Sequence, residues 1–138
     1  MPGRTGTPHT RKAKAMSKRS EARKQFLADV LSTAIEGGIN YWANIDSAER
    51  VECEQDVIGW RYGSVRIHDK VDGTAFGTMH IIDANTVARG LRELRNSTRY
   101  PFKELRKADR TNGNEGDFDA ADADAVIQLG IFGEIVYG

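Results

Sequence analysis

The spacing of apolar residues changes twice along this chain of 138 residues. Between Phe26 and Ile35 they recur every three or four positions, as on one face of an α-helix. In three stretches between residues 39 and 82 they alternate with polar residues, as in β-strands, and from Val87 the helical spacing returns. The sequence therefore predicts an α+β fold, in which a small antiparallel sheet of about three strands packs with about four helices.

The length fits one domain, which we assign to residues 20–138. Residues 1–19 are basic, lack apolar periodicity and are expected to form a disordered tail, within which Met16 could equally be the true start in place of Met1. No apolar run approaches the roughly 20 residues of a membrane helix. Cys53 is the single cysteine, which excludes an internal disulfide. We therefore expect a soluble, cytoplasmic protein that does not contact the membrane.

Three stretches predict the strands of the sheet: INYWANI (39–45), VIGWRYGSVRI (57–67) and TAFGTMHII (74–82). The apolar face of the second stretch changes phase across Gly63, which indicates a bulge or a tight turn. Asp72-Gly73 is a typical hairpin turn. The acidic stretch SAERVECEQD (47–56) predicts a loop or a short helix. These patterns leave the strand order open.

Helix boundaries are indicated by capping residues. Gly37-Gly38 predicts the end of the first helix, and Asp83 is placed to cap the start of the second. A shorter helix is expected over residues 101–110, and a last one from about Ala120 to Gly130. The chain after it is expected to end in an extended segment.

Four aspartates lie close together around the start of the last expected helix: Asp117, Asp119, Asp122 and Asp124. Asp119 is predicted to be its N-cap, with Asp122 reaching back to it in a capping box, rather than both being ligands of a metal. Asp124 lies one turn further on, at the border of the apolar arc. We expect its partner to be a basic side chain from the segment Arg89 to Arg110.

The formal net charge of zero hides a segregation of charge along the chain. Residues 1–24 hold eight basic side chains and one acidic side chain, a net charge of +7. Residues 89–110 hold eight basic and three acidic side chains, a net charge of +5. Such asymmetry favours an acidic partner for the basic segments, either a nucleic acid or the acidic remainder of the protein itself.

Three blocks of the sequence together resemble a known family: FLADVLSTAIEGGINYW, DANTVARGLRELR and DADAVIQLGIFGEIVYG. The family consists of small proteins of actinobacteria, their plasmids and especially their phages, and the likeness runs from about Leu27 to Gly138. The family has no assigned activity, so the resemblance transfers no catalytic or binding residues. It implies a context, because small proteins of phages and mobile elements more often modify a host process than carry out metabolic chemistry.

Aromatic and basic side chains on the predicted strands form a candidate ligand site. Aromatic faces beside arginines can stack a base and neutralise a phosphate. Aromatic residues on strands also build cores and protein interfaces, and both alternatives stay open. The candidate ligand-binding residues are Tyr41, Trp42, Trp60, Arg61, Tyr62, Arg66, His68 and His80.

The basic segment that follows is the alternative site, suited to the phosphate backbone of a nucleic acid. Its candidate residues are Arg89, Arg92, Arg95, Lys103, Arg106 and Lys107. Glu93, Glu104 and Asp109 interleave with them at ion-pair spacing, so internal pairing is the competing interpretation.

Catalytic motifs are missing from the sequence. His68 and His80 each have an aspartate nearby, yet their spacing matches no metal signature. The acidic neighbours of Cys53 disfavour its thiolate, and no phosphate loop or nucleophile elbow is present. We therefore expect no metal, no cofactor and no enzymatic activity.

The expected function is that of a phage or mobile-element accessory protein, which binds and modulates a host protein or a nucleotide-like ligand. Anti-defence activity is one form that this function can take. The alternative is a nucleic-acid-binding accessory protein.

Overall fold

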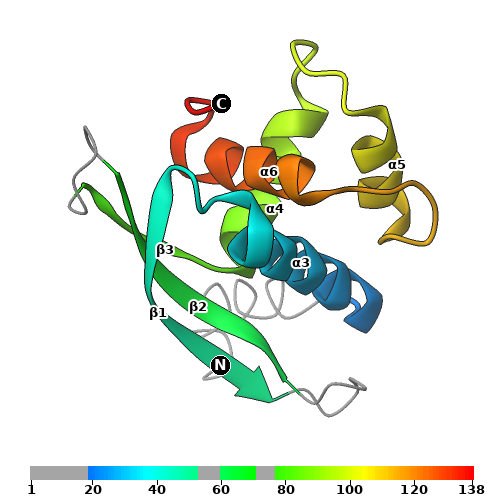
Figure 1. Ribbon diagram of the computed structural model, residues 1–138. Coiled ribbons are helices and arrows are strands. Elements are labelled where there is room, and N and C mark those ends of the chain that lie inside the picture. The colour runs from blue at the N-terminus through cyan, green and yellow to red at the C-terminus, as the bar shows by residue number, and fades with distance from the viewer. Residues whose placement is uncertain (1–18, 53–59, 71–76) are drawn as a thin grey trace, which may run out of the picture.

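The computed structural model describes residues 19–52, 60–70 and 77–138. Within these ranges the chain forms four α-helices and a three-stranded antiparallel sheet, so the predicted α+β class is confirmed. The helices lie on one face of the sheet (Figure 1). None of the described helices is long and apolar enough to cross a membrane. The predicted disordered tail, apart from Arg19, and the predicted turn at Asp72-Gly73 lie outside the described residues.

The first helix, α3 (Glu21–Thr33), buries the apolar stripe that predicts it. Its N-cap is Ser20, whose hydroxyl accepts a hydrogen bond from the Arg23 amide at 3.0 Å. The helix continues as one wider turn, η1 (Ala34–Gly38), which ends at the predicted glycine pair. The apolar side chains of α3 form part of the main core: Phe26, Leu27, Val30 and Leu31.

The sheet has the strand order β1-β2-β3, with β1 at Ala43–Glu52, β2 at Trp60–Asp69 and β3 at Met79–Ile82. Residues 47–52 belong to β1, so the prediction of a loop or short helix there is wrong. Because β1 is an edge strand with exposed side chains from Asp46 to Val51, it lacks the apolar alternation that would reveal it. Tyr41 and Trp42 precede the strand, in a turn closed by the Trp42 amide and the Ile39 carbonyl at 3.0 Å.

Two irregularities interrupt the β1–β2 ladder. On β1, Asp46 is an extra residue between two paired positions. On β2, Gly63 and its successor together face Glu49 alone, which confirms the irregularity predicted at Gly63. This second bulge lets Tyr62 and Val65, three positions apart, both pack against the core.

Three further helices follow: α4 (Ala84–Arg95), α5 (Lys103–Thr111) and α6 (Ala120–Phe132). Helices α4 and α6 contact β3, whereas α5 lies farther from the sheet (Figure 1). Asp83 caps α4 as predicted, accepting hydrogen bonds from the Asn85 and Thr86 amides at 2.9 and 3.1 Å. The capping box predicted for α6 is also present, between Asp119 and Asp122. The segment after α6 adopts no regular secondary structure but packs Ile135 and Tyr137 against the core.

Helices α4 and α6 cross at glycines, and this contact gives a first prediction. A Cβ at Gly90 would collide with the Val126 carbonyl, so Gly90→Ala must push the two helices apart. We expect Gly90→Ala to lower the free energy of unfolding by about 1–3 kcal/mol, measured by urea denaturation. Gly37→Ala is the control, because its Cβ would lie 3.8 Å from the Ala120 Cβ, an ordinary contact. Equal effects of both substitutions would contradict this account.

Candidate functional site

The structure does not bring the eight candidate ligand-binding residues together. Tyr41 and Trp42 lie before β1, at the end of the hairpin where Ala43 pairs with Asp69. Arg61 and Tyr62 lie at the other end of the same ladder. Trp60 begins β2 there, and its side chain is outside the described part of the structure. Arg66 lies between the two ends with its side chain exposed.

Trp42 belongs to the core. Only 2% of its surface is exposed, and its ring stacks on Tyr137 with centroids 4.9 Å apart and planes 6° apart. Its indole Nε1 donates a hydrogen bond to Asp124 Oδ1 at 2.7 Å. Trp42 therefore holds the C-terminal segment against α6, and it is not available to stack a ligand in this conformation.

Asp124 has aromatic and amide partners, so the prediction of a basic partner from residues 89–110 is wrong. Besides the Trp42 indole, Asp124 accepts hydrogen bonds from the Tyr41 hydroxyl at 2.7 Å and from Gln128 Nε2 at 3.0 Å. The buried Gln128 continues the network, because its Oε1 accepts hydrogen bonds from the Val136 and Tyr137 amides at 2.8 and 2.7 Å. Neutral donors thus surround this buried carboxylate.

Tyr41 offers a test of this network. Burial of its hydroxyl and the adjacent Asp124 carboxylate raise the pKa of Tyr41 from 10.0 to about 12, although 54% of the residue as a whole is exposed. Because the folded state holds this proton more tightly, the stabilisation is complete below pH 10.0 and is lost as the pH rises through about 12. We expect the late titration of Tyr41 to appear in an alkaline absorbance titration of the wild type and to be missing in Tyr41→Phe. An unchanged titration in that variant would contradict the assignment.

The two histidines lie on opposite faces of the sheet. His80 pairs across the ladder with the buried Ile67, whereas His68 pairs with the exposed Met79. Each contacts a separate carboxylate: His68 Nδ1 lies 2.7 Å from Asp46, and His80 Nε2 lies 3.3 Å from Asp69. They therefore do not share one site, and the described residues contain no group of three side chains suited to holding a metal.

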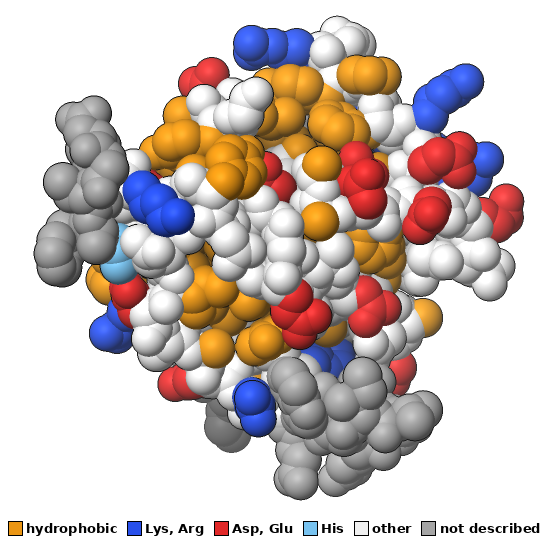
Figure 2. All heavy atoms as spheres, in the orientation of Figure 1, with side chains coloured by type: hydrophobic (Ala, Val, Ile, Leu, Met, Phe, Trp, Pro, Cys, Tyr) orange, Lys and Arg blue, Asp and Glu red, His pale blue; other side chains and the backbone are white. Residues whose placement is uncertain are grey.

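Acidic side chains gather near the connection between α5 and α6, at the right of Figure 2. A shallow cavity of about 220 Å³ there is lined by Glu104, Asp117, Phe118, Asp119 and Asp122. Burial, with neighbouring Asp119 and Asp117, raises the pKa of Asp122. Asp119 and Asp122 bond each other's backbone amides at 2.9 and 3.0 Å, which accounts for both as capping residues.

Most of the alternative basic residues have partners within the protein. Arg95 contacts both oxygens of Asp109, and Lys107 lies 3.7 Å from Glu104. The Arg89 and Arg106 side chains donate to backbone carbonyl groups. Within the described residues, Arg92 and Lys103 form no ion pair with a carboxylate. Carboxylate partners therefore account for two of the six residues, Arg95 and Lys107, whereas Arg89 and Arg106 bond backbone carbonyl groups and keep their charge.

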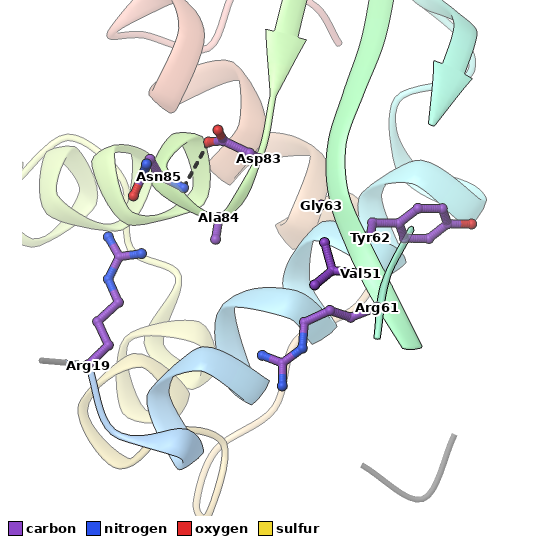
Figure 3. A pocket seen from close by; sticks show the side chains of 8 residues that line it. All are labelled: Arg19, Val51, Arg61, Tyr62, Gly63, Asp83, Ala84 and Asn85. Atoms are coloured by element: carbon purple, nitrogen blue, oxygen red, sulfur yellow. Dashed lines mark hydrogen bonds between the residues drawn. The ribbon is translucent and has the colours of Figure 1, made fainter. Parts of the chain in front are cut away.

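A larger cavity, of about 400 Å³, opens between the β1–β2 hairpin and the start of α4. We call it the arginine cavity. Figure 3 shows the Arg19 and Arg61 side chains on two sides of it, with the first turn of α4 alongside. Two of the sequence candidates, Arg61 and Tyr62, line this cavity. The described residues that line it are Arg19, Val51, Arg61, Tyr62, Gly63, Asp83, Ala84 and Asn85.

Among the described residues that line the arginine cavity, Arg19 and Arg61 carry guanidinium groups and Asp83 carries a carboxylate. One oxygen of Asp83 already accepts hydrogen bonds from the Asn85 and Thr86 amides, which places its charge at the helix N-terminus. Sequence reasoning found Arg61 but not Arg19, because a residue at the end of a basic tail carries no signal of where it will lie.

Comparison of the chain with protein-family models, with curated proteins and with solved structures found no match.

Proposed function

We propose that this chain is a non-enzymatic binding protein of a phage or mobile element, and that it captures a nucleotide-like ligand in the arginine cavity. The observation that carries the proposal is the placement of Arg19 and Arg61 beside one cavity of about 400 Å³. That volume lies within the range of roughly 300–1,000 Å³ that holds small organic ligands. The chain would act by withdrawing such a ligand, or by presenting it, in a host process.

Guanidinium groups support a phosphate-bearing ligand in particular. Each presents planar N–H donors that match phosphate oxygens in pairs. Arg19 and Arg61 come from separate segments of the chain, so a ligand that spans both would contact the start of α3 and the β1–β2 hairpin together. Val51 and Ala84 add apolar lining, against which a sugar or base can pack.

The test is a calorimetric titration with mono-, di- and cyclic nucleotides, preceded by a thermal-shift panel. A ligand that binds the folded state raises the melting temperature by mass action. We expect Arg61→Ala to weaken binding roughly tenfold or more, because a charge-assisted hydrogen bond contributes about 1.5–3 kcal/mol. Arg110→Ala, an exposed arginine on α5, is the matched control. Equal binding by Arg61→Ala and the wild type would remove the arginine cavity as the site.

The nucleic-acid alternative predicts a different response. Binding to single- or double-stranded DNA through phosphates weakens steeply as salt concentration rises. In that case Arg92→Ala and Lys103→Ala would reduce binding, whereas Arg61→Ala would not. Arg92 and Lys103 are exposed and have no ion-pair partner in the described part of the chain. A protein that binds nucleotides but not DNA at low salt supports the arginine cavity.

A further inference from the structure

The segment that follows α6 is held to the protein by side chains. Residues 134–138, which we call the docked segment, belong to no helix or strand. The backbone amides of Val136 and Tyr137 donate to Gln128 Oε1 at 2.8 and 2.7 Å. The Ile135 amide donates to the Tyr100 hydroxyl at 3.4 Å. Release of the docked segment would therefore break no helical turn and no strand ladder.

Gln128 binds the main chain of the docked segment through both ends of its amide group. Besides accepting from the two amides, it donates from Nε2 to the Tyr137 carbonyl group at 3.3 Å. A peptide that adds to the edge of a sheet is bound in a similar way, through its main-chain N–H and C=O groups. Because Gln128 is fully buried, its oxygen needs donors from an occupant at this position. The contact thus recognises a peptide backbone.

One side chain of the docked segment fills an aromatic site. The Tyr137 ring stacks on Trp42 with centroids 4.9 Å apart, and it meets Phe132 edge-on with centroids 6.1 Å apart. Val136, the preceding residue, is 54% exposed, so the surface makes little demand on that side chain. The surface beneath the docked segment therefore selects an extended backbone with an aromatic residue at one position.

Gly133 separates the docked segment from α6. Its φ of +76° lies in the left-handed region that favours glycine, and it caps the end of the helix. A Cβ at this position would meet no atom within 4 Å. Packing at the junction therefore does not hold the docked segment in place, and its attachment depends on Gln128, Tyr100 and the aromatic site.

We propose that the docked segment is a tethered occupant of a peptide-binding surface, and that an extended segment of another protein, carrying an aromatic residue, binds there in its place. The aromatic ring takes the position of Tyr137, and the backbone beside it takes the hydrogen bonds of Gln128. Trp42 lies at the opposite end of the β1–β2 hairpin from Arg61, so the proposal is independent of the arginine cavity.

The tether determines how a free peptide competes for this surface. A segment joined by a short linker acts at an effective concentration on the order of millimolar. The apparent affinity for a free peptide falls in proportion to the fraction of molecules in which the surface is open. Weakening the docked segment should therefore strengthen the binding of a free peptide, whereas damage to the surface should weaken it.

The test is fluorescence anisotropy of a labelled peptide with the sequence of residues 133–138, titrated with the whole chain. We expect Tyr137→Ala to bind this peptide about tenfold more tightly than the wild type does, because its own segment no longer stacks on Trp42. Val136→Ala is the matched control, since Val136 is an exposed residue of the same segment, and it should bind as the wild type does. A peptide with alanine in place of tyrosine should bind neither. Circular dichroism would verify that both variants fold.

Hydrogen exchange of the wild type supplies a second measurement, which needs no substitution. The amides of Val136 and Tyr137 should exchange faster than those at the centre of α6, through local opening, and faster still with excess unlabelled peptide. Exchange as slow as that of α6 would overturn the proposal. So would equal peptide binding by Tyr137→Ala and the wild type, absence of binding to Tyr137→Ala, or equal binding of the tyrosine and alanine peptides.

Discussion

Replacing Asp109 by alanine is expected to lower the free energy of unfolding by about 2–4 kcal/mol. The Asp109 side chain is 2% exposed and accepts hydrogen bonds from Arg95 at 2.8 and 3.0 Å and from Arg23 at 2.7 Å. Removing one member of a buried ion-pair group leaves the other charges without compensation, at a cost of about 3–5 kcal/mol. We expect a smaller effect because Arg23 and Arg95 remain 21% and 46% exposed and can turn to solvent.

This prediction is specific to the position, and the control is Asp117→Ala. Asp117 is exposed and lies in the connection before α6, so its replacement should change stability by no more than about 0.5 kcal/mol. Urea denaturation monitored by circular dichroism measures both variants. Asp109 joins α3, α4 and α5 through its bonds to Arg23 and Arg95. If Asp109→Ala lost no more stability than Asp117→Ala, these helices would hold together by apolar packing alone.

Replacing Trp42 by alanine should have the other large effect, about 3–5 kcal/mol. The substitution removes a buried ring that stacks on Tyr137 and contacts Phe132 with centroids 5.8 Å apart. It also takes one of the donors from the buried Asp124 carboxylate. The C-terminal segment would then lose its main packing surface as well as core volume.

Trp42→Phe separates the two contributions. Phenylalanine keeps most of the packing but cannot donate a hydrogen bond to Asp124, so we expect a loss of about 1–3 kcal/mol. Val136→Ala is the control, since Val136 belongs to the same segment but is 54% exposed. If Trp42→Phe is as stable as the wild type, Asp124 is satisfied by Tyr41 and Gln128 without the indole.

The helices could be predicted from the sequence because each carries its own signals. The apolar stripe of α4 and its cap at Asp83 lie within a few residues of each other, and so do the capping aspartates of α6. Local hydrogen bonds and helical periodicity depend on sequence neighbours alone. The irregularity at Gly63 was predictable for the same reason, because the change of apolar phase occurs within one strand.

The long-range partners of buried charges could not be predicted in this way. Asp109 pairs with Arg95 inside the basic segment, where its spacing suggests an internal ion pair, but it also binds Arg23. Asp124 binds Trp42, and both Arg23 and Trp42 lie more than eighty positions from the aspartate that they contact. Those pairings depend on how α3 and the turn before β1 dock against the later helices. The arginine cavity is of the same kind, since Arg19 and Arg61 meet only through the docking of α3, the hairpin and α4.

The two bulges of the β1–β2 ladder compensate each other. The extra residue at Asp46 shifts the pairing by one position, and the extra residue at Gly63 shifts it back, so Arg61 and Tyr62 face β1 in the register of the first pairs. A change of one residue in either strand would turn the residues beyond it to the opposite face of the sheet. We therefore expect a length change within one strand to be tolerated only with a matching change in the other, and the orientation of Arg61 toward its cavity depends on an aspartate at the far end of the ladder.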